Sequence, residues 1–245
     1  MPYIKEICMA GKILEVRKYY TLRYNCKGEK REGRCKHTCE CQQKVNRRNA
    51  ERTLRRLMNA NFTDNTGMLV TLTYLPKNRP ENSAQMQNDM RNFLKMLRKK
   101  FKARGETLKY IYVKELGKKG AAHIHILMSV CDIRELRECW KKGSARADAL
   151  WSKGDYTNIA KYFIKYAAKT EETEGRLIGK RWNASRNLKQ PVVIKKIVQA
   201  NTFSQRISEK KGYQLDPTSV REGYTEFGFK YFSYVMRKME SKEGG

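Results

Sequence analysis

The chain lacks any run of apolar residues that approaches the roughly 20 needed for a membrane-spanning helix. Its first ten residues also lack the apolar core of a secretory signal peptide. These two absences argue against a membrane partner and against export. We therefore expect a cytoplasmic protein.

Acidic residues are scarce, with 25 Asp and Glu against 53 Lys and Arg, which gives a formal net charge of +28. A charge of this size says little about the fold, but it does indicate the partner. Phosphate backbones bind Lys and Arg with release of counterions. Nucleic acid is therefore the first candidate partner.

The seven cysteines are odd in number, which argues against a disulfide framework in a cytoplasmic chain. Four of them gather near the N-terminus, with His37 close by: Cys26, Cys35, Cys39 and Cys41. Their side chains are plausible donors for a structural Zn²⁺, but their spacing is not the paired CxxC spacing of a zinc ribbon. Both a structural zinc site and metal-free thiols stay open.

The chain has only three histidines, and two of them form the triplet His123-Ile124-His125. The alternation from 121 to 130 predicts a strand, in which successive side chains point to opposite faces. Both imidazoles therefore lie on one face. Neutral imidazole is the commonest nitrogen ligand of metals, so this pair indicates a divalent metal site.

Glu115 is the natural third ligand, because an oxygen donor completes a site for Mg²⁺ or Mn²⁺. A four-residue turn over 117–120 would place Glu115 opposite Ala122, on the wrong face. A five-residue connection ending at Ala121, or a bulge, would place it opposite His123. The alternative is an ordinary solvated glutamate.

The segment Tyr162-x-x-Lys165-Tyr166-x-x-Lys169 repeats one unit twice. On a helix, residues three and four apart share a face, so the segment displays two phenols and two ammonium groups along one stripe. A turn of about 100° per residue puts Tyr162 at the border of the apolar face and Tyr166 nearer its centre. The residues of that packing face are Ile159, Phe163 and Ala167.

This placement makes Tyr162 the primary candidate nucleophile, while Tyr166 is either a second nucleophile or a structural residue. A phenol is almost wholly protonated at neutral pH. Nearby cations such as Lys165 and Lys169 favour the phenolate and can hold a phosphate in the transition state.

The order of predicted strands and helices indicates an α+β fold, an antiparallel sheet with helices on one face. Three segments are expected: an N-terminal arm with the Cys-rich loop and a basic helix (1–66), a core (67–170), and a C-terminal extension packed on the core (171–245).

The motifs occur in an order that resembles the HUH endonucleases: the strand 69–73, then Glu115 ahead of His123-Ile124-His125, then the doubled tyrosine. Within that superfamily the chain is most similar to the two-tyrosine rolling-circle replication initiators of small phages and plasmids. The resemblance spans roughly residues 67 to 170. It implies a five-stranded antiparallel sheet with a ferredoxin-like, RNA-recognition-type HUH core.

The resemblance also implies an activity, that of a metal-dependent, site-specific DNA endonuclease and strand transferase. Such an enzyme nicks single-stranded origin DNA, keeps the 5′ phosphate on tyrosine and leaves a 3′ hydroxyl that primes a polymerase. The implied partners are origin DNA and the host helicase and polymerase, in the cytoplasm of the host cell.

Further residues fit contacts with DNA. Thr71 and Thr73 share one strand face, where they either hydrogen-bond near the metal or to DNA, or are ordinary strand residues. The basic run on the long amphipathic helix is a solvated face that also follows phosphates, and it includes Arg98, Lys99 and Lys100. The three tryptophans are candidates for stacking on bases or for core packing: Trp140, Trp151 and Trp182.

Two other functions compete with the initiator. One is a transposase or relaxase of the same superfamily, which shares the nicking chemistry but mobilises DNA. The other is a non-catalytic, basic nucleic-acid-binding protein. The second explains the charge, but it does not explain Glu115, the two histidines and the tyrosine doublet together.

Overall fold

The computed structural model describes residues 3–21, 40–116, 122–174, 181–199 and 203–239, with only the backbone of residues 169–174. By its internal contacts the chain forms two units. One unit combines Met1–Gln43 with Gln190–Gly245, and the other is Lys44–Lys189. These units differ from the three segments expected from the sequence, because the two ends of the chain contribute to one sheet.

The unit Lys44–Lys189 is built on a five-stranded antiparallel sheet of order β6-β3-β5-β4-β7. The α+β fold and the five-stranded antiparallel sheet are thus confirmed. The strands are β3 (Gly67–Tyr74), β4 (Tyr110–Leu116), β5 (Ala122–Ser129), β6 (Gly143–Ala149) and β7 (Asn183–Ala184). The helices are α1 (Glu40–Asn61), α2 (Ser83–Ala103), α3 (Ile133–Cys139) and α4 (Thr157–Glu174), with a short 3₁₀ turn, η1 (Pro76–Asn78).

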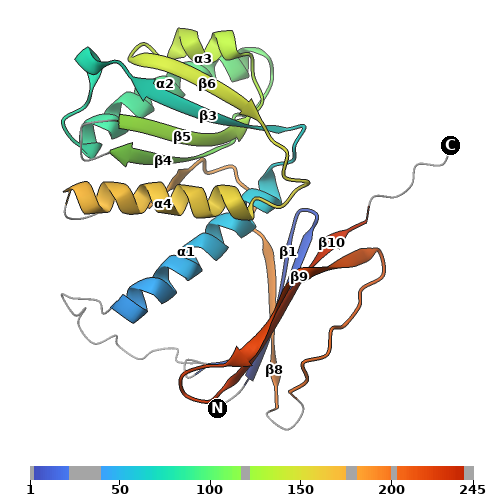
Figure 1. The fold of residues 1–245 in the computed structure, drawn as a ribbon. Helices are drawn as coiled ribbons and strands as arrows, with labels where there is room; N and C mark the ends of the chain where they lie inside the picture. Colours follow the sequence, from blue (N-terminus) through green and yellow to red (C-terminus); the bar gives the residue numbers. More distant parts are fainter. Residues whose placement is uncertain (1–2, 22–39, 117–121, 175–180, 200–202, 240–245) are drawn as a thin grey trace, which may run out of the picture. The chain divides into compact units, whose positions relative to one another are not determined.

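Helices pack against both faces of this sheet, and the expectation of helices on one face is wrong. One core lies between the sheet and the helices α2 and α3, with Leu97 and Trp140 among its buried residues. A second core on the other face includes residues of α1 and α4 (Figure 1). The physical reason is that β4 is buried on both faces, so Ile111 and Val113 need cover as much as Tyr112 does.

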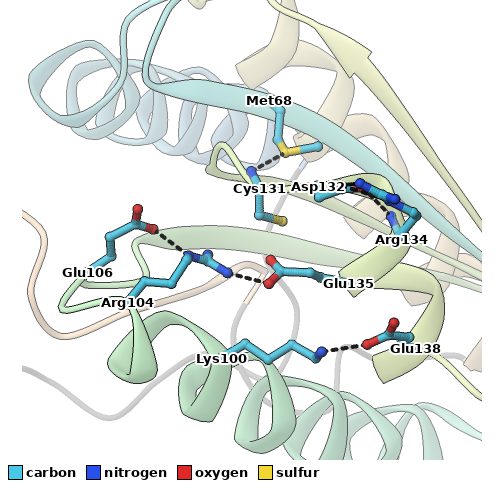
Figure 2. Close-up of polar contacts among 9 residues, drawn as sticks. All are labelled: Met68, Lys100, Arg104, Glu106, Cys131, Asp132, Arg134, Glu135 and Glu138. Atoms are coloured by element: carbon cyan, nitrogen blue, oxygen red, sulfur yellow. Dashed lines mark hydrogen bonds and ion pairs between the residues drawn. The ribbon is translucent and has the colours of Figure 1, made fainter.

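The long helix α2 follows from its sequence pattern. Its apolar residues recur at helical spacing and are buried, for example Met86, Met90 and Leu97. The side chain of Asn82 caps its first turn by accepting a hydrogen bond from the Gln85 backbone amide. Ion pairs join α2 and its C-terminal cap to α3: Lys100 of α2 with Glu138, and the cap residue Arg104 with Glu135 (Figure 2).

The other unit contains a second five-stranded antiparallel sheet, of order β8-β1-β2-β10-β9. Its strands are β1 (Tyr3–Ala10), β2 (Ile13–Tyr20), β8 (Val192–Val198), β9 (Tyr213–Tyr224) and β10 (Lys230–Lys238). Buried residues of β2 and β10 form a small core on it, among them Val16, Phe232 and Met236. Residues 3–20 of the expected N-terminal segment therefore form a hairpin within this sheet.

Candidate functional site

The strand register places Glu115 directly opposite His123. β4 ends at Leu116 and β5 begins at Ala122, so five residues connect them; these residues, 117–121, lie outside the described part of the chain. This is the register predicted for a five-residue connection. On the other side of β5, Thr73 lies opposite His123 and Thr71 opposite His125.

Hydrogen bonds link the histidines to both neighbouring strands. His125 Nε2 lies 2.9 Å from Glu115 Oε2, and both side chains are buried. Thr71 Oγ1 lies 3.3 Å from His125 Nδ1, and Thr73 Oγ1 lies 3.1 Å from His123 Nδ1. For His123, a Thr73 hydroxyl that accepts from Nδ1–H leaves the ring lone pair on Nε2, the nitrogen that would then serve as a metal ligand. In His125, Nε2–H donates to the Glu115 carboxylate, so a metal bound there would replace that proton. The two threonines therefore lie where they can orient the histidine rings, and contact with DNA stays a prediction.

The donors fit a divalent cation in part. Two adjacent ligands of an octahedral ion with bonds of about 2.1 Å lie about 3 Å apart, which matches the 2.9 Å between Glu115 and His125. The His123 ring stands further off, its centroid 6.2 Å from that of His125. Among the described residues, no three His, Cys, Asp or Glu side chains are arranged to hold a metal ion. Glu115 and His125 thus lie at the spacing of two ligands, and His123 shares their face of the sheet.

The two tyrosines of α4 differ in exposure, as the helical geometry predicts. Tyr162 is 45% exposed, whereas Tyr166 is 8% exposed. The Tyr166 ring stacks on His125, with centroids 4.0 Å apart and 8° between the planes. Tyr162 contacts Tyr166 edge-on at 4.2 Å, and its ring lies 5.8 Å from that of His125. The phenols are therefore packed beside the histidines, with Tyr162 on the solvent side.

The surroundings of Tyr166 keep it a neutral phenol. Burial raises its pKa, and the hydrogen bond with Tyr162 and the negative charge of Glu115 raise it further. Deprotonation is therefore harder for Tyr166 than for an ordinary phenol. Tyr166 also packs on His125 and on Tyr162, and a role as second nucleophile stays a prediction.

Tyr162 also lines a cleft of about 520 Å³ between α1 and α4. Both helices contribute polar side chains to it. Those from α1 are Lys44, Arg47, Arg48 and Glu51, and those from α4 are Asn158, Lys161, Tyr162 and Lys165. The lining thus holds five cations and one carboxylate together with the exposed phenol, and Lys165 lines the same cleft as Tyr162.

The basic run on α2 is not brought to this site. Arg98, Lys99 and Lys100 belong to the helix that packs on the opposite face of the sheet from the histidines. Arg98 donates to the Tyr110 hydroxyl at 2.7 Å, and Lys100 pairs with Glu138 (Figure 2). Two of these three cations therefore serve contacts within the protein.

Several predicted residues lie beyond the described part of the structure. Cys26, Cys35 and Cys39 fall in the segment 22–39, so a zinc site there stays a prediction; Cys41 is an exposed residue of α1. The side chain of Lys169 is likewise not described.

Two features of the site were not predicted from the sequence. The first is the part of α1 that lines the cleft; its signal was the spacing of Lys44, Arg47, Arg48 and Glu51. The second is the position of Trp151, which is 90% exposed, whereas Trp140 is buried.

The loop that carries Trp151 is held by Asp64. The Asp64 carboxylate accepts hydrogen bonds from the Ser152 amide and hydroxyl, from the Lys153 amide and from the Tyr156 hydroxyl. An exposed tryptophan on a braced loop is suited to stacking on a nucleobase.

A scan against protein families matches residues 67–171 to the replication-associated protein ORF2/G2P family. The matched segment is about two fifths of the chain and includes Glu115, the two histidines and both tyrosines. Comparisons with curated proteins and with solved structures gave no match. No helix in the described ranges is long and apolar enough to cross a membrane. Residues 67–171 are thus similar to a family of replication-associated proteins.

Proposed function

We propose that this protein initiates rolling-circle replication by nicking and rejoining single-stranded origin DNA through a phosphotyrosine intermediate. The observation that carries the proposal is the position of Tyr162. Its exposed phenol lies against Tyr166 and near His125, which is bonded to Glu115. These groups all fall within the segment that matches the replication-associated family.

In the proposed reaction the Tyr162 phenol loses its proton to solvent, and its oxygen attacks the scissile phosphate. A bond forms between that oxygen and phosphorus, and the bond from phosphorus to the 3′ oxygen breaks. The 3′ oxygen takes up a proton and becomes the free hydroxyl. The 5′ phosphate stays on the enzyme as a diester, so the reverse attack by a 3′ hydroxyl rejoins the strand without an external energy source.

The residues around Tyr162 have distinct tasks in this reaction. Lys165 lines the same cleft as the phenol, where its charge favours the phenolate and the anionic transition state. Glu115, His123 and His125 would hold Mg²⁺ or Mn²⁺, and imidazole nitrogens among the donors favour Mn²⁺. Such an ion supplies charge stabilisation at the scissile phosphate and at the leaving oxygen. Tyr166 packs on His125 and positions the ring of Tyr162.

The decisive experiment is adduct formation with DNA. The protein is incubated with labelled single-stranded circular DNA and Mn²⁺ or Mg²⁺, then denatured and run on a gel. We expect a protein–DNA adduct that survives denaturation and is absent with EDTA. DNA binding without any adduct would favour a non-catalytic binding protein and overturn the proposal. Adducts that form at transposon ends or transfer origins, but not at replication origins, would favour the transposase or relaxase function.

A further inference from the structure

We propose that the cleft between α1 and α4 binds the phosphodiester backbone of single-stranded DNA beside the scissile phosphate. This inference rests on the proposed function, since it assigns the path of the strand that Tyr162 attacks. It adds α1 to the substrate-binding surface. That helix, Glu40–Asn61, lies wholly outside the segment 67–171 that matches the family.

The two helices line the cleft with stripes of the same spacing. On α1 the lining residues Lys44, Arg47, Arg48 and Glu51 are at positions i, i+3, i+4 and i+7, and those on α4, from Asn158 to Lys165, repeat this spacing. Residues so spaced share one face of a helix. Each helix thus turns one continuous polar face to the cleft. Other residues of the two helices pack in one shared core, where Leu54 of α1 and Phe163 of α4 are buried.

The charge of the cleft matches a phosphate chain. Arg47 forms an ion pair with Glu51 at 3.4 Å, which offsets the one carboxylate in the lining. Lys44, Arg48, Lys161 and Lys165 have no ion pair among the described residues, and all four are exposed to solvent. A cleft that carries four such cations favours a polyanion over a neutral ligand.

The size and the position of the cleft favour a single strand. Its volume of about 520 Å³ lies within the roughly 300–1,000 Å³ of pockets that hold small ligands, so it admits a nucleotide-sized stretch of chain. Tyr162 is part of its wall, so a phosphate in the cleft lies beside the phenol that attacks it. Single-strand binding grooves commonly combine cations that follow the backbone with aromatic rings.

The test compares two pairs of substitutions that remove the same charge from opposite faces of the sheet. The test pair is Lys44→Ala with Arg48→Ala, on the cleft face of α1. The control pair is Arg91→Ala with Lys95→Ala, exposed on α2 and with the same i, i+4 spacing. Both pairs are made in the wild-type protein and in a Tyr162→Phe background, in which binding is measured without turnover.

Binding of a labelled single-stranded oligonucleotide is followed by fluorescence anisotropy over a range of salt concentrations. For the test pair we expect weaker binding and a log–log salt slope that is less steep by about 0.7 for each phosphate no longer neutralised, or about 1.4 for two. In cleavage assays the test pair should raise KM and leave kcat at saturating DNA nearly unchanged, because these side chains hold the strand before and during the reaction. The control pair should change neither the slope nor KM.

Equal effects of the two pairs would show a general charge effect and overturn the proposed cleft. If the test-pair variant binds and cleaves DNA as the wild-type protein does, the proposed cleft is overturned while the proposed nicking activity stands. A loss of affinity confined to the test pair, in a protein that forms no adduct, would leave the cleft as a binding site and refute the nicking function. Circular dichroism of both pairs checks that the fold is intact, as expected for exposed positions.

Discussion

The sharpest prediction concerns Tyr162→Phe and Tyr166→Phe, which each remove one oxygen and keep the ring. The two hydroxyls share a hydrogen bond, so both variants remove the same bond. Such a bond contributes about 0.5–1.5 kcal/mol to the free energy of unfolding. In a folded unit of this size that corresponds to a fall of roughly 2–4 °C in Tm per kcal/mol. We therefore expect a small decrease in stability from each substitution.

Their effects on cleavage should differ sharply. Tyr162→Phe removes the exposed phenol in the cleft, and the first nick should fall by roughly 10³-fold or more, as when other enzymes lose their nucleophile. Tyr166→Phe should spare the first nick and impair the second transfer that releases a closed circle. Single-turnover cleavage of labelled DNA gives both rates, and peptide mapping of the trapped adduct identifies the modified residue.

The assignment would be reversed by an adduct found on Tyr166 alone. Finding DNA on neither tyrosine would refute the covalent mechanism. A large decrease in the stability of either variant would contradict the small contribution expected of one hydrogen bond. Thermal unfolding of both variants, measured under the conditions of the cleavage assay, separates that outcome from a catalytic defect.

Three other perturbations test the surroundings of the site. The His123→Ala, His125→Ala double variant should bind DNA but not cleave it, and near wild-type cleavage would refute the metal assignment. Its free energy of unfolding, measured in urea, should be about 1–3 kcal/mol smaller, because buried Glu115 loses its hydrogen bond with His125. Trp151→Ala should weaken binding to single-stranded DNA by about 1–3 kcal/mol per stacked base, with unchanged affinity as the contrary result in an anisotropy titration. Burial alone would raise the pKa of Asp64, but the hydrogen bonds that it accepts lower its pKa below the ordinary value. The carboxylate therefore stabilises the fold fully at a pH above the ordinary pKa, and this contribution is lost as the pH falls through the lowered pKa. Asp64→Asn should therefore unfold more readily than wild type in urea at pH 7, and this gap should close in strong acid; a gap that is independent of pH would contradict the charge-based contribution.

Much of the core that carries the site could be predicted because its signals are local. The apolar spacing of α2 and the alternation of β5 predict elements within one or two residues of those observed. The short connection after Leu116 leaves few possible registers, and one of them is the observed pairing of Glu115 with His123. Angles on one helix were enough to rank the exposure of Tyr162 above that of Tyr166.

The second sheet could not be predicted, because its pairings join the two ends of the chain. β2 pairs with β10, so Val16 meets Tyr234 across most of the sequence. β9 is largely exposed and has no clear apolar alternation, so its residues carry little signal of a strand. A strand of this kind is stabilised by its partner rather than by its own pattern.

The cleft depends both on local sequence patterns and on contacts between distant segments of the chain. Each of its two polar stripes is visible in the sequence as an i, i+3, i+4, i+7 set, but the sequence does not say that they face each other. The two stripes lie beside one cleft because apolar residues of both helices pack in the same core, among them Met58 of α1 and Phe163 of α4. The exposed position of Tyr162 has the same origin, because it borders the face that Phe163 anchors. The packing that buries α4 therefore also sets the phenol among the cations, and a substitution that rotates this helix should disturb both DNA binding and cleavage.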